Sequence, residues 1–134
     1  MVSLTPDMME LIRSTRYFPL ATASAGGDPN VVPVGSVFLI DPETIWIGNQ
    51  FMNATIKNVK ENPRASIYVW TQGVKGCLKI KADVTVVEEG EDYEKMKGMV
   101  SAKRAELKCR SLLVLKITEV FECTSGKDAG KKLL

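Results

Sequence analysis

The residues best suited to bind a ligand lie where a predicted strand gives way to a predicted helix. Gly48 permits a tight turn there, and Asn53 precedes Ala54 and Thr55 at the expected helix start. A helix N-terminus has free N–H groups and a positive partial charge, both of which suit a phosphate. Thr55 would add a hydroxyl, and Lys57 would supply a countercharge. The segment therefore predicts either a phosphate site or an ordinary capped helix.

A second unusual segment lies within the predicted strand over residues 30–40. Proline gives no N–H to a strand ladder, and glycine has no side chain to pack. Both occur together in the run Val32, Pro33, Val34, Gly35 and Ser36. The run indicates a bulge, or a place where a ligand comes close to the backbone. The alternative is a plain edge strand.

Other kinds of chemistry are restricted by what the sequence lacks. The chain contains no histidine, which removes Ser-His-Asp, Cys-His and most metal-based catalysis. Its three cysteines, Cys77, Cys109 and Cys123, form no CxxC pair, and a zinc site would need a fourth ligand. We expect structural thiols and no metal. Cys109 is expected to be an inert thiol in a flexible cationic loop; the alternative is that the flanking Lys108 and Arg110 lower its pKa.

The composition predicts one globular domain. The 134 residues are 45% hydrophobic and 25% charged, and the net charge of +2 is interleaved along the chain, which argues against nucleic acid. We expect a domain over residues 1–126 and a flexible basic tail over residues 127–134. Because no apolar run reaches the length of a membrane span and residues 1–16 do not resemble a signal peptide, we expect a cytoplasmic protein.

The hydrophobic periodicity predicts six strands and three helices. Thr5 and Pro6 mark the start of the first helix, and the other two helices are expected over residues 54–61 and 91–103. The strands are expected over residues 17–24, 30–40, 44–48, 64–70, 77–87 and 111–124. Short connections between these elements predict a mainly β (β+α) fold, a closed or partly closed antiparallel barrel. Trp46 and Tyr68 are expected to be core aromatics.

Three stretches together resemble the FMN-binding split-barrel family, the group related to pyridoxamine 5′-phosphate oxidase. They match in order and spacing over nearly the whole chain: residues 19–34 without the turn at 24–26, residues 54–64 and residues 75–82. The similarity is greatest to the small single-domain FMN-binding proteins of this family. It implies a six-stranded antiparallel split β-barrel with about three short helices.

The resemblance also implies a homodimer with FMN at its interface. Residues 32–36 would run past the flavin ring and ribityl chain, and their backbone groups would hydrogen-bond the ring edge. The ribityl phosphate would be held by Gly48, Asn49 and the segment that includes Asn53, Ala54, Thr55, Lys57 and Asn58. Trp70, Gln72, Lys75 or Gly76 would close the site. Many family members have a lysine or arginine where this chain has Ala54, so the phosphate loses one countercharge.

The function that follows is a flavoprotein of uncertain enzymatic activity. It would be an oxidoreductase with a small-molecule electron donor or acceptor. The alternatives are a non-catalytic flavin carrier or electron-transfer module, an F420-binding relative on the same fold, and a structural dimer with a vestigial site. Without histidine and a C-terminal extension for a pyridoxal phosphate pocket, we do not expect a true pyridoxamine 5′-phosphate oxidase.

Overall fold

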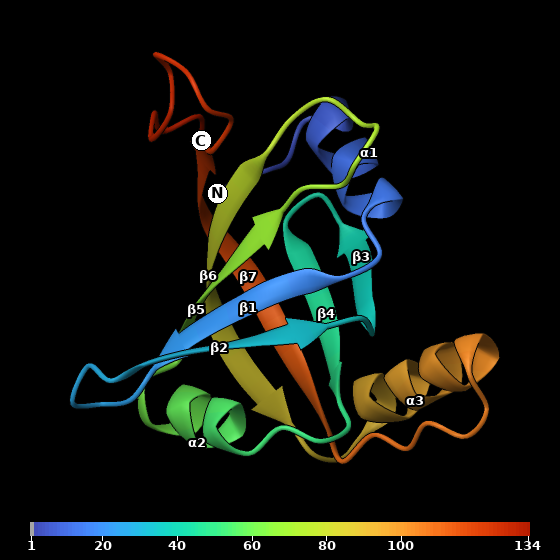
Figure 1. The fold of residues 1–134 in the computed structure, drawn as a ribbon. Coiled ribbons are helices and arrows are strands. Elements are labelled where there is room, and N and C mark those ends of the chain that lie inside the picture. Colours follow the sequence, from blue (N-terminus) through green and yellow to red (C-terminus); the bar gives the residue numbers. More distant parts are fainter. Residues whose placement is uncertain (1) are drawn as a thin grey trace.

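One curled antiparallel sheet forms most of the computed structural model, which describes residues 2–134 (Figure 1). Its strands are β1 (Phe18–Ala23), β2 (Pro29–Val34), β3 (Val37–Asp41), β4 (Thr44–Asn49), β5 (Arg64–Val69), β6 (Leu78–Val87) and β7 (Ser111–Glu122). They are ordered β2-β1-β5-β6-β7-β4-β3. The three helices are α1 (Pro6–Ser14), α2 (Ala54–Glu61) and α3 (Glu91–Lys103). The predicted mainly β fold, a partly closed antiparallel barrel with three helices, is confirmed.

The prediction of six strands was wrong by one, because the segment expected as a single strand over residues 30–40 divides into β2 and β3. β2 pairs with β1 and β3 pairs with β4, so the chain changes partner across Gly35 and Ser36. A Cβ at Gly35 would lie only 3.1 Å from Cε1 of Tyr17, so glycine permits the close approach there. The two halves end on opposite edges of the sheet, and the barrel is split between them.

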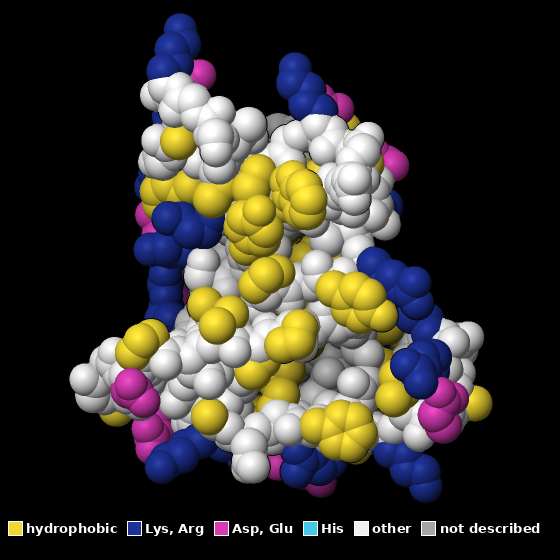
Figure 2. Space-filling model, in the orientation of Figure 1, with side chains coloured by type: hydrophobic (Ala, Val, Ile, Leu, Met, Phe, Trp, Pro, Cys, Tyr) yellow, Lys and Arg dark blue, Asp and Glu magenta, His cyan; other side chains and the backbone are white. Residues whose placement is uncertain are grey.

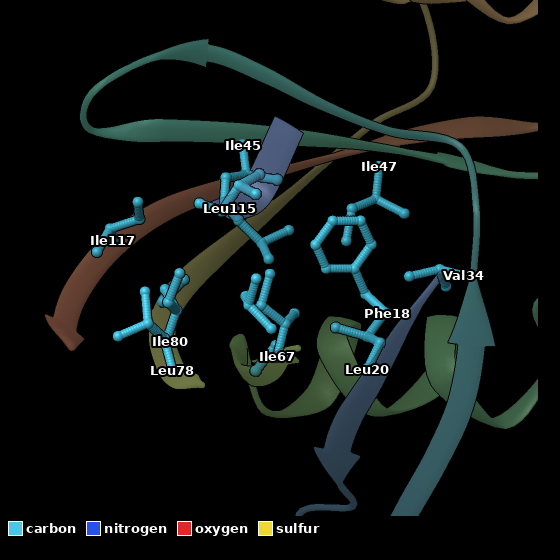
Figure 3. Packing of buried hydrophobic residues seen from close by; sticks show 14 of the residues in the cluster. Phe18, Leu20, Val34, Ile45, Ile47, Ile67, Leu78, Ile80, Leu115 and Ile117 are labelled. Carbon is cyan, nitrogen blue, oxygen red and sulfur yellow. The ribbon is translucent and has the colours of Figure 1, made fainter. Parts of the chain in front are cut away.

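The core fills the inside of the curl. Figure 3 shows Phe18 and Leu20 of β1 facing Ile45 and Ile47 of β4 across the interior, with Ile67 of the neighbouring strand β5 beside Leu20. Alternate residues of β6 are buried, as its period of two predicts. Burying apolar area at roughly 25 cal/mol per Å² makes this interior the main source of stability.

A second cluster lies under α3 and holds one of the two aromatics expected in the core. Trp46 is buried there with Met96, Val100 and Leu112. Tyr68, also expected in the core, is instead 40% exposed on the outer surface of β5. A strand of this sheet has one inward and one outward face, and Tyr68 falls on the outward one between the buried Ile67 and Val69.

The helices begin and end where the sequence signals predict. Thr5 Oγ1 accepts a hydrogen bond from the N–H of Met8 at 3.3 Å and caps α1. α2 ends at Asn62, directly before Pro63. α2 packs against β1 and β2, whereas α3 packs against β4 and β7 (Figure 1). No helix among residues 2–134 combines the length and apolar character that crossing a membrane requires.

The C-terminal segment lies along β7. The N–H of Glu122 donates to the carbonyl of Lys131 at 2.8 Å, and the N–H of Leu133 donates to the carbonyl of Val120 at 2.7 Å. Phe121 and Lys132 form a bridge. The last four residues thus occupy a stretch of β7 that β4 does not pair with, a position that the sequence did not indicate.

Candidate functional site

A cavity of about 330 Å³ opens where the edge of β2 meets the start of α2. One wall is the strand segment and the other is the end of β4 with the loop into α2. Its lining consists of Val32, Pro33, Val34, Gly35, Gly48, Gln50, Phe51, Met52, Asn53, Ala54 and Thr55. The two segments selected from the sequence therefore lie across one cavity, although β3 and most of β4 separate them in the chain.

The α2 end of this cavity offers unpaired N–H groups. Asn53 occupies the N-cap position, but its side chain makes no capping hydrogen bond. The first N–H groups of a helix have no partner within the helix, and the exposed Ala54 carries one of them at the cavity wall. These groups and the positive end of the helix dipole favour an anion.

Thr55 and Asn58 belong to a buried polar network that holds α2 against the sheet. The amide of Asn30 donates to Oγ1 of Thr55 at 3.0 Å, and the amide of Asn58 donates to Oγ1 of Thr22 at 3.1 Å. The Thr55 hydroxyl keeps its own proton for donation and borders the cavity. Asn58 is not part of the lining and positions the helix.

Asn49 fastens the loop between β4 and α2. Its amide donates to Oγ of Ser111 at 2.8 Å, and its carbonyl oxygen accepts from the N–H of Met52 at 2.9 Å. The side chain is buried, and both its amide group and its carbonyl oxygen are hydrogen-bonded within the protein. Asn49, expected to contact phosphate, therefore supports the cavity wall from behind.

Arg110 holds the same loop in place, and no pattern in the sequence indicated this role. Its Nε donates to the carbonyl of Gln50 at 3.1 Å, and its Nη2 donates to the carbonyl of Met52 at 2.8 Å. The planar fork of the guanidinium suits two acceptors on one loop. The residue lies far along the chain from the loop, so only the fold brings the two together.

The cavity has no charged side chain among its lining residues within the described chain. Lys57, expected as the phosphate countercharge, is exposed and lies outside the lining. Ala54, where a cation would face the cavity, leaves a neutral methyl group. Anion binding here would depend on the helix terminus and on the Thr55 hydroxyl.

A second cavity of about 570 Å³ adjoins the first and shares Gly35, Gln50 and Phe51 with it. Ser36 lines this second cavity, and its Oγ accepts a hydrogen bond from the Gln50 amide. Phe51 is 85% exposed between the two cavities. Sequence reasoning missed Gln50, Phe51 and Met52, because a loop has no periodicity to read.

Trp70 does not reach the first cavity. It is 49% exposed and lines a third cavity of about 430 Å³ with Tyr68 and Gln72. This third cavity meets the first only through Pro33. Lys75 and Gly76, the other residues expected to close the site, line neither of them.

The thiol of Cys109 lies behind the cavity wall and is not activated. Burial raises its pKa, and this effect outweighs the opposing hydrogen bond from Gln50 and the charge of Lys97. The flanking residues Lys108 and Arg110 are not among the causes. Of the two sequence alternatives, the inert thiol therefore agrees with the structure.

Alkylation of Cys109 by iodoacetamide is expected to be slower at pH 7.5 than that of a free cysteine. The thiolate is the reactive form, and a raised pKa reduces its fraction. The rate should continue to rise above about pH 8.5, where a free cysteine is half ionised. Mass spectrometry of the Cys109 peptide measures this, with an unstructured cysteine peptide as control. Faster alkylation than in the control would contradict the assignment.

The sequence matches the family model described as pyridoxamine 5′-phosphate oxidase over residues 4–124. An uncharacterized protein of Methanocaldococcus jannaschii is 34% identical over 133 residues, which cover 97% of this chain and 87% of the relative. The crystal structure of HupZ from Group A Streptococcus superposes with a TM-score of 0.81 at 24% identity, covering 95% of this chain and 99% of HupZ.

Structures that share this fold include proteins named for different cofactors. An FMN-binding protein from Syntrophomonas wolfei has a TM-score of 0.70 at 20% identity, covering 89% of this chain and 90% of that one. A heme storage protein from Vibrio cholerae, HutZ, also has a TM-score of 0.70 at 20% identity and covers 90% and 94%. An F420 reductase has a TM-score of 0.65 at 20% identity and covers 83% and 93%. Because the family model spans nearly the whole chain, the protein belongs to the pyridoxamine 5′-phosphate oxidase family.

Proposed function

We propose that this protein binds FMN in the first cavity and acts as a flavoprotein in electron transfer, as an oxidoreductase or as a carrier. The observation that carries the proposal is a neutral cavity with strand backbone along one wall and a helix N-terminus at its end. A flavin ring needs hydrogen bonds along its edge, and its phosphate needs N–H donors. The volume of about 330 Å³ falls within the roughly 300–1,000 Å³ of small-molecule pockets.

Different residues would bind the ring and the phosphate of the cofactor. β2 is an edge strand, so its outer N–H and C=O groups are available to the ring, except at Pro33, which has no N–H. Ala54 and Thr55 at the start of α2 would hold the phosphate through their N–H groups and the Thr55 hydroxyl. Bound FMN would itself supply hydride and single-electron chemistry. The chain contains no histidine that could add acid–base catalysis.

The proposal includes a homodimer. Large hydrophobic side chains are exposed beside the cavities, including Tyr17 (62%), Val31 (64%), Phe51 (85%) and Trp70 (49%). Figure 2 shows hydrophobic side chains spread over the face formed by β1, β2 and β5. Apolar surface of this extent on a small domain favours contact with another protein surface. A second copy of the chain would cover this face and complete each flavin pocket.

Titration of cofactor-free protein with FMN is expected to quench flavin fluorescence saturably, at one FMN per subunit. Sedimentation of the loaded protein should give a dimer, because a second copy would cover the exposed hydrophobic side chains beside the cavities. Riboflavin, which lacks the phosphate, is the matched control. It should bind more weakly than FMN, because it cannot interact with the N–H groups at the start of α2.

Absence of FMN binding, together with binding of F420, would overturn the cofactor assignment. A monomer that retains full FMN affinity would overturn the shared pocket. A screen of small-molecule donors that includes NADH and NADPH separates the two alternatives. If none of them reduces the FMN-loaded dimer, the protein is a flavin carrier and not an oxidoreductase.

A further inference from the structure

Two of the three cysteines lie opposite each other at one end of the sheet. Figure 1 shows the start of β6 beside the end of β7, below the C-terminal loop. These strands pair antiparallel with Leu78 opposite Glu122, so Cys77 and Cys123 are the next pair along the ladder. The N–H of Cys123 donates to the carbonyl of Cys77 at 2.9 Å. Directly opposite residues of an antiparallel pair point to the same face, so the two thiols lie side by side.

The two thiols differ in their surroundings. Cys77 is buried and Cys123 is half-buried. Burial raises the pKa of Cys77; a hydrogen bond with Tyr68 opposes this effect, and one with Cys123 adds to it. The same hydrogen bond raises the pKa of Tyr68. Cys77 is therefore in hydrogen-bond contact with both the Tyr68 hydroxyl and the second thiol.

Core packing does not explain why cysteines occupy these positions. Leu78 belongs to the main hydrophobic cluster, and its neighbour Cys77 points to the opposite face of the strand. Cys77 belongs to neither of the two clusters described above, whereas Cys109 packs in the cluster under α3. A buried thiol outside both clusters, opposite a second thiol, is an arrangement that chemistry explains better than packing.

The backbone positions suit a disulfide. Opposite residues that share a ladder hydrogen bond have Cα atoms about 5.5 Å apart, within the range of about 4.4–6.8 Å for disulfides. Their Cβ atoms must approach by up to about 1 Å. Both cysteines adjoin a loop, and Gly76 before Cys77 has a φ of 117°. Cys109 cannot compete, because the 12 residues of β7 place it roughly 40 Å from Cys123.

We propose that Cys77 and Cys123 form a reversible disulfide when the protein meets hydrogen peroxide. The more accessible Cys123 thiolate attacks one peroxide oxygen: an S–O bond forms, the O–O bond breaks, and the other oxygen leaves as water after taking a proton. The Cys77 sulfur then attacks the sulfur of this sulfenic acid. The S–S bond forms, the S–O bond breaks, and hydroxide leaves as water with the Cys77 proton. Two thiols thus lose two electrons, and one peroxide is reduced to two waters.

The disulfide would tie the start of β6 to the turn that leads into the C-terminal segment. Cys123 directly follows Glu122, whose carbonyl accepts from the N–H of Gly130 at 2.7 Å and whose N–H donates to Lys131. Neither cysteine lines the first or the second cavity. The modification therefore does not depend on the proposed flavin. Because closure requires the strand ends to shift, the bond is strained and readily reduced by thiols.

The test treats reduced protein with a small excess of hydrogen peroxide at pH 7.5 and removes the peroxide with catalase. In denaturant, the reduced chain should take up three iodoacetamide groups and the treated chain only one, because two of the three cysteines are joined. Tryptic digestion should yield residues 76–79 linked to residues 117–127. Dithiothreitol should separate the two peptides and restore the uptake of three groups.

Three variants assign the steps. Cys123→Ser should give no linked peptide and leave Cys77 reduced, since Cys77 is buried. In Cys77→Ser, the sulfenic acid at Cys123 should persist and react with dimedone. Cys109→Ser is the matched control and should form the linked peptide as fast as the unaltered protein.

The unaltered protein decides the proposal even if a variant does not fold. A linkage between Cys123 residues of two chains would overturn it, as would sulfinic acid at Cys123 without a link to Cys77. An unreacted Cys123 after peroxide treatment would overturn it equally. FMN titration of the treated protein, which should match that of the reduced protein, shows that the outcome is independent of the proposed function.

Discussion

The Ala54→Lys variant is expected to bind FMN about 10- to 150-fold more tightly than the unaltered protein. Ala54 is exposed at the first position of α2 and borders the uncharged cavity. A lysine there would add a charge-assisted hydrogen bond to the phosphate, worth about 1.5–3 kcal/mol, which converts to this range of affinity. Fluorescence quenching by the two proteins at equal salt measures the change.

A lysine at this position also has a cost. A cation at a helix N-terminus opposes the dipole by about 0.3–1 kcal/mol, so the free variant should be slightly less stable to urea. The gain in FMN affinity should shrink as salt rises, because the new contact is solvent-exposed. Riboflavin affinity should not rise, since riboflavin carries no phosphate.

The matched control is Ala25→Lys, which adds the same charge in the exposed turn between β1 and β2. Its FMN affinity should stay near that of the unaltered protein. Equal affinities in the Ala54→Lys and unaltered proteins would place the phosphate away from the start of α2.

The Asn49→Ala variant is expected to lose both stability and FMN affinity. It would leave the buried Ser111 hydroxyl and the partly buried Met52 N–H without their partner. Each buried group left unsatisfied costs about 1–3 kcal/mol, out of a total stability of about 5–15 kcal/mol for a typical domain. Urea denaturation at 25 °C measures the first effect and FMN titration the second.

Asn53→Ala is the control for this variant. Asn53 is exposed and its side chain makes no capping hydrogen bond, so the free energy of unfolding should hardly change. If Asn49→Ala weakens FMN binding but keeps the stability of the unaltered protein, Asn49 contacts the cofactor itself, contrary to its placement behind the wall.

Local signals in the sequence predicted the secondary structure well. Thr5 and Pro6 mark the start of α1, and Pro63 marks the end of α2, because capping and proline sterics act within a few residues. The alternation along β6 predicted its buried face for the same reason. The prediction was wrong for one strand, over residues 30–40. Pro33 and Gly35 indicated an irregular strand there, but they did not indicate that the chain leaves β1 and pairs with β4 beyond this point.

The candidate site could be predicted only in part. Its two walls follow from unusual residues in short segments, and both segments do line one cavity. The positions of Asn49 and Lys57 could not be judged, because the orientation of a side chain depends on what packs behind it. Arg110 and Phe51 have no local pattern at all, and their contribution depends on the path of a loop.

The sequence by itself determined the family, the strand and helix boundaries to within a few residues, and the exclusion of histidine chemistry. These depend on residue type and short spacing, which the chain carries whether folded or not. Only the tertiary structure decided that β2 and β3 lie on opposite edges of the sheet and that Arg110 supports the loop before α2. It also brought Arg13 and Lys103 to one cavity. Such contacts join residues that are distant in the chain. They form only when the whole sheet folds and buries its apolar face.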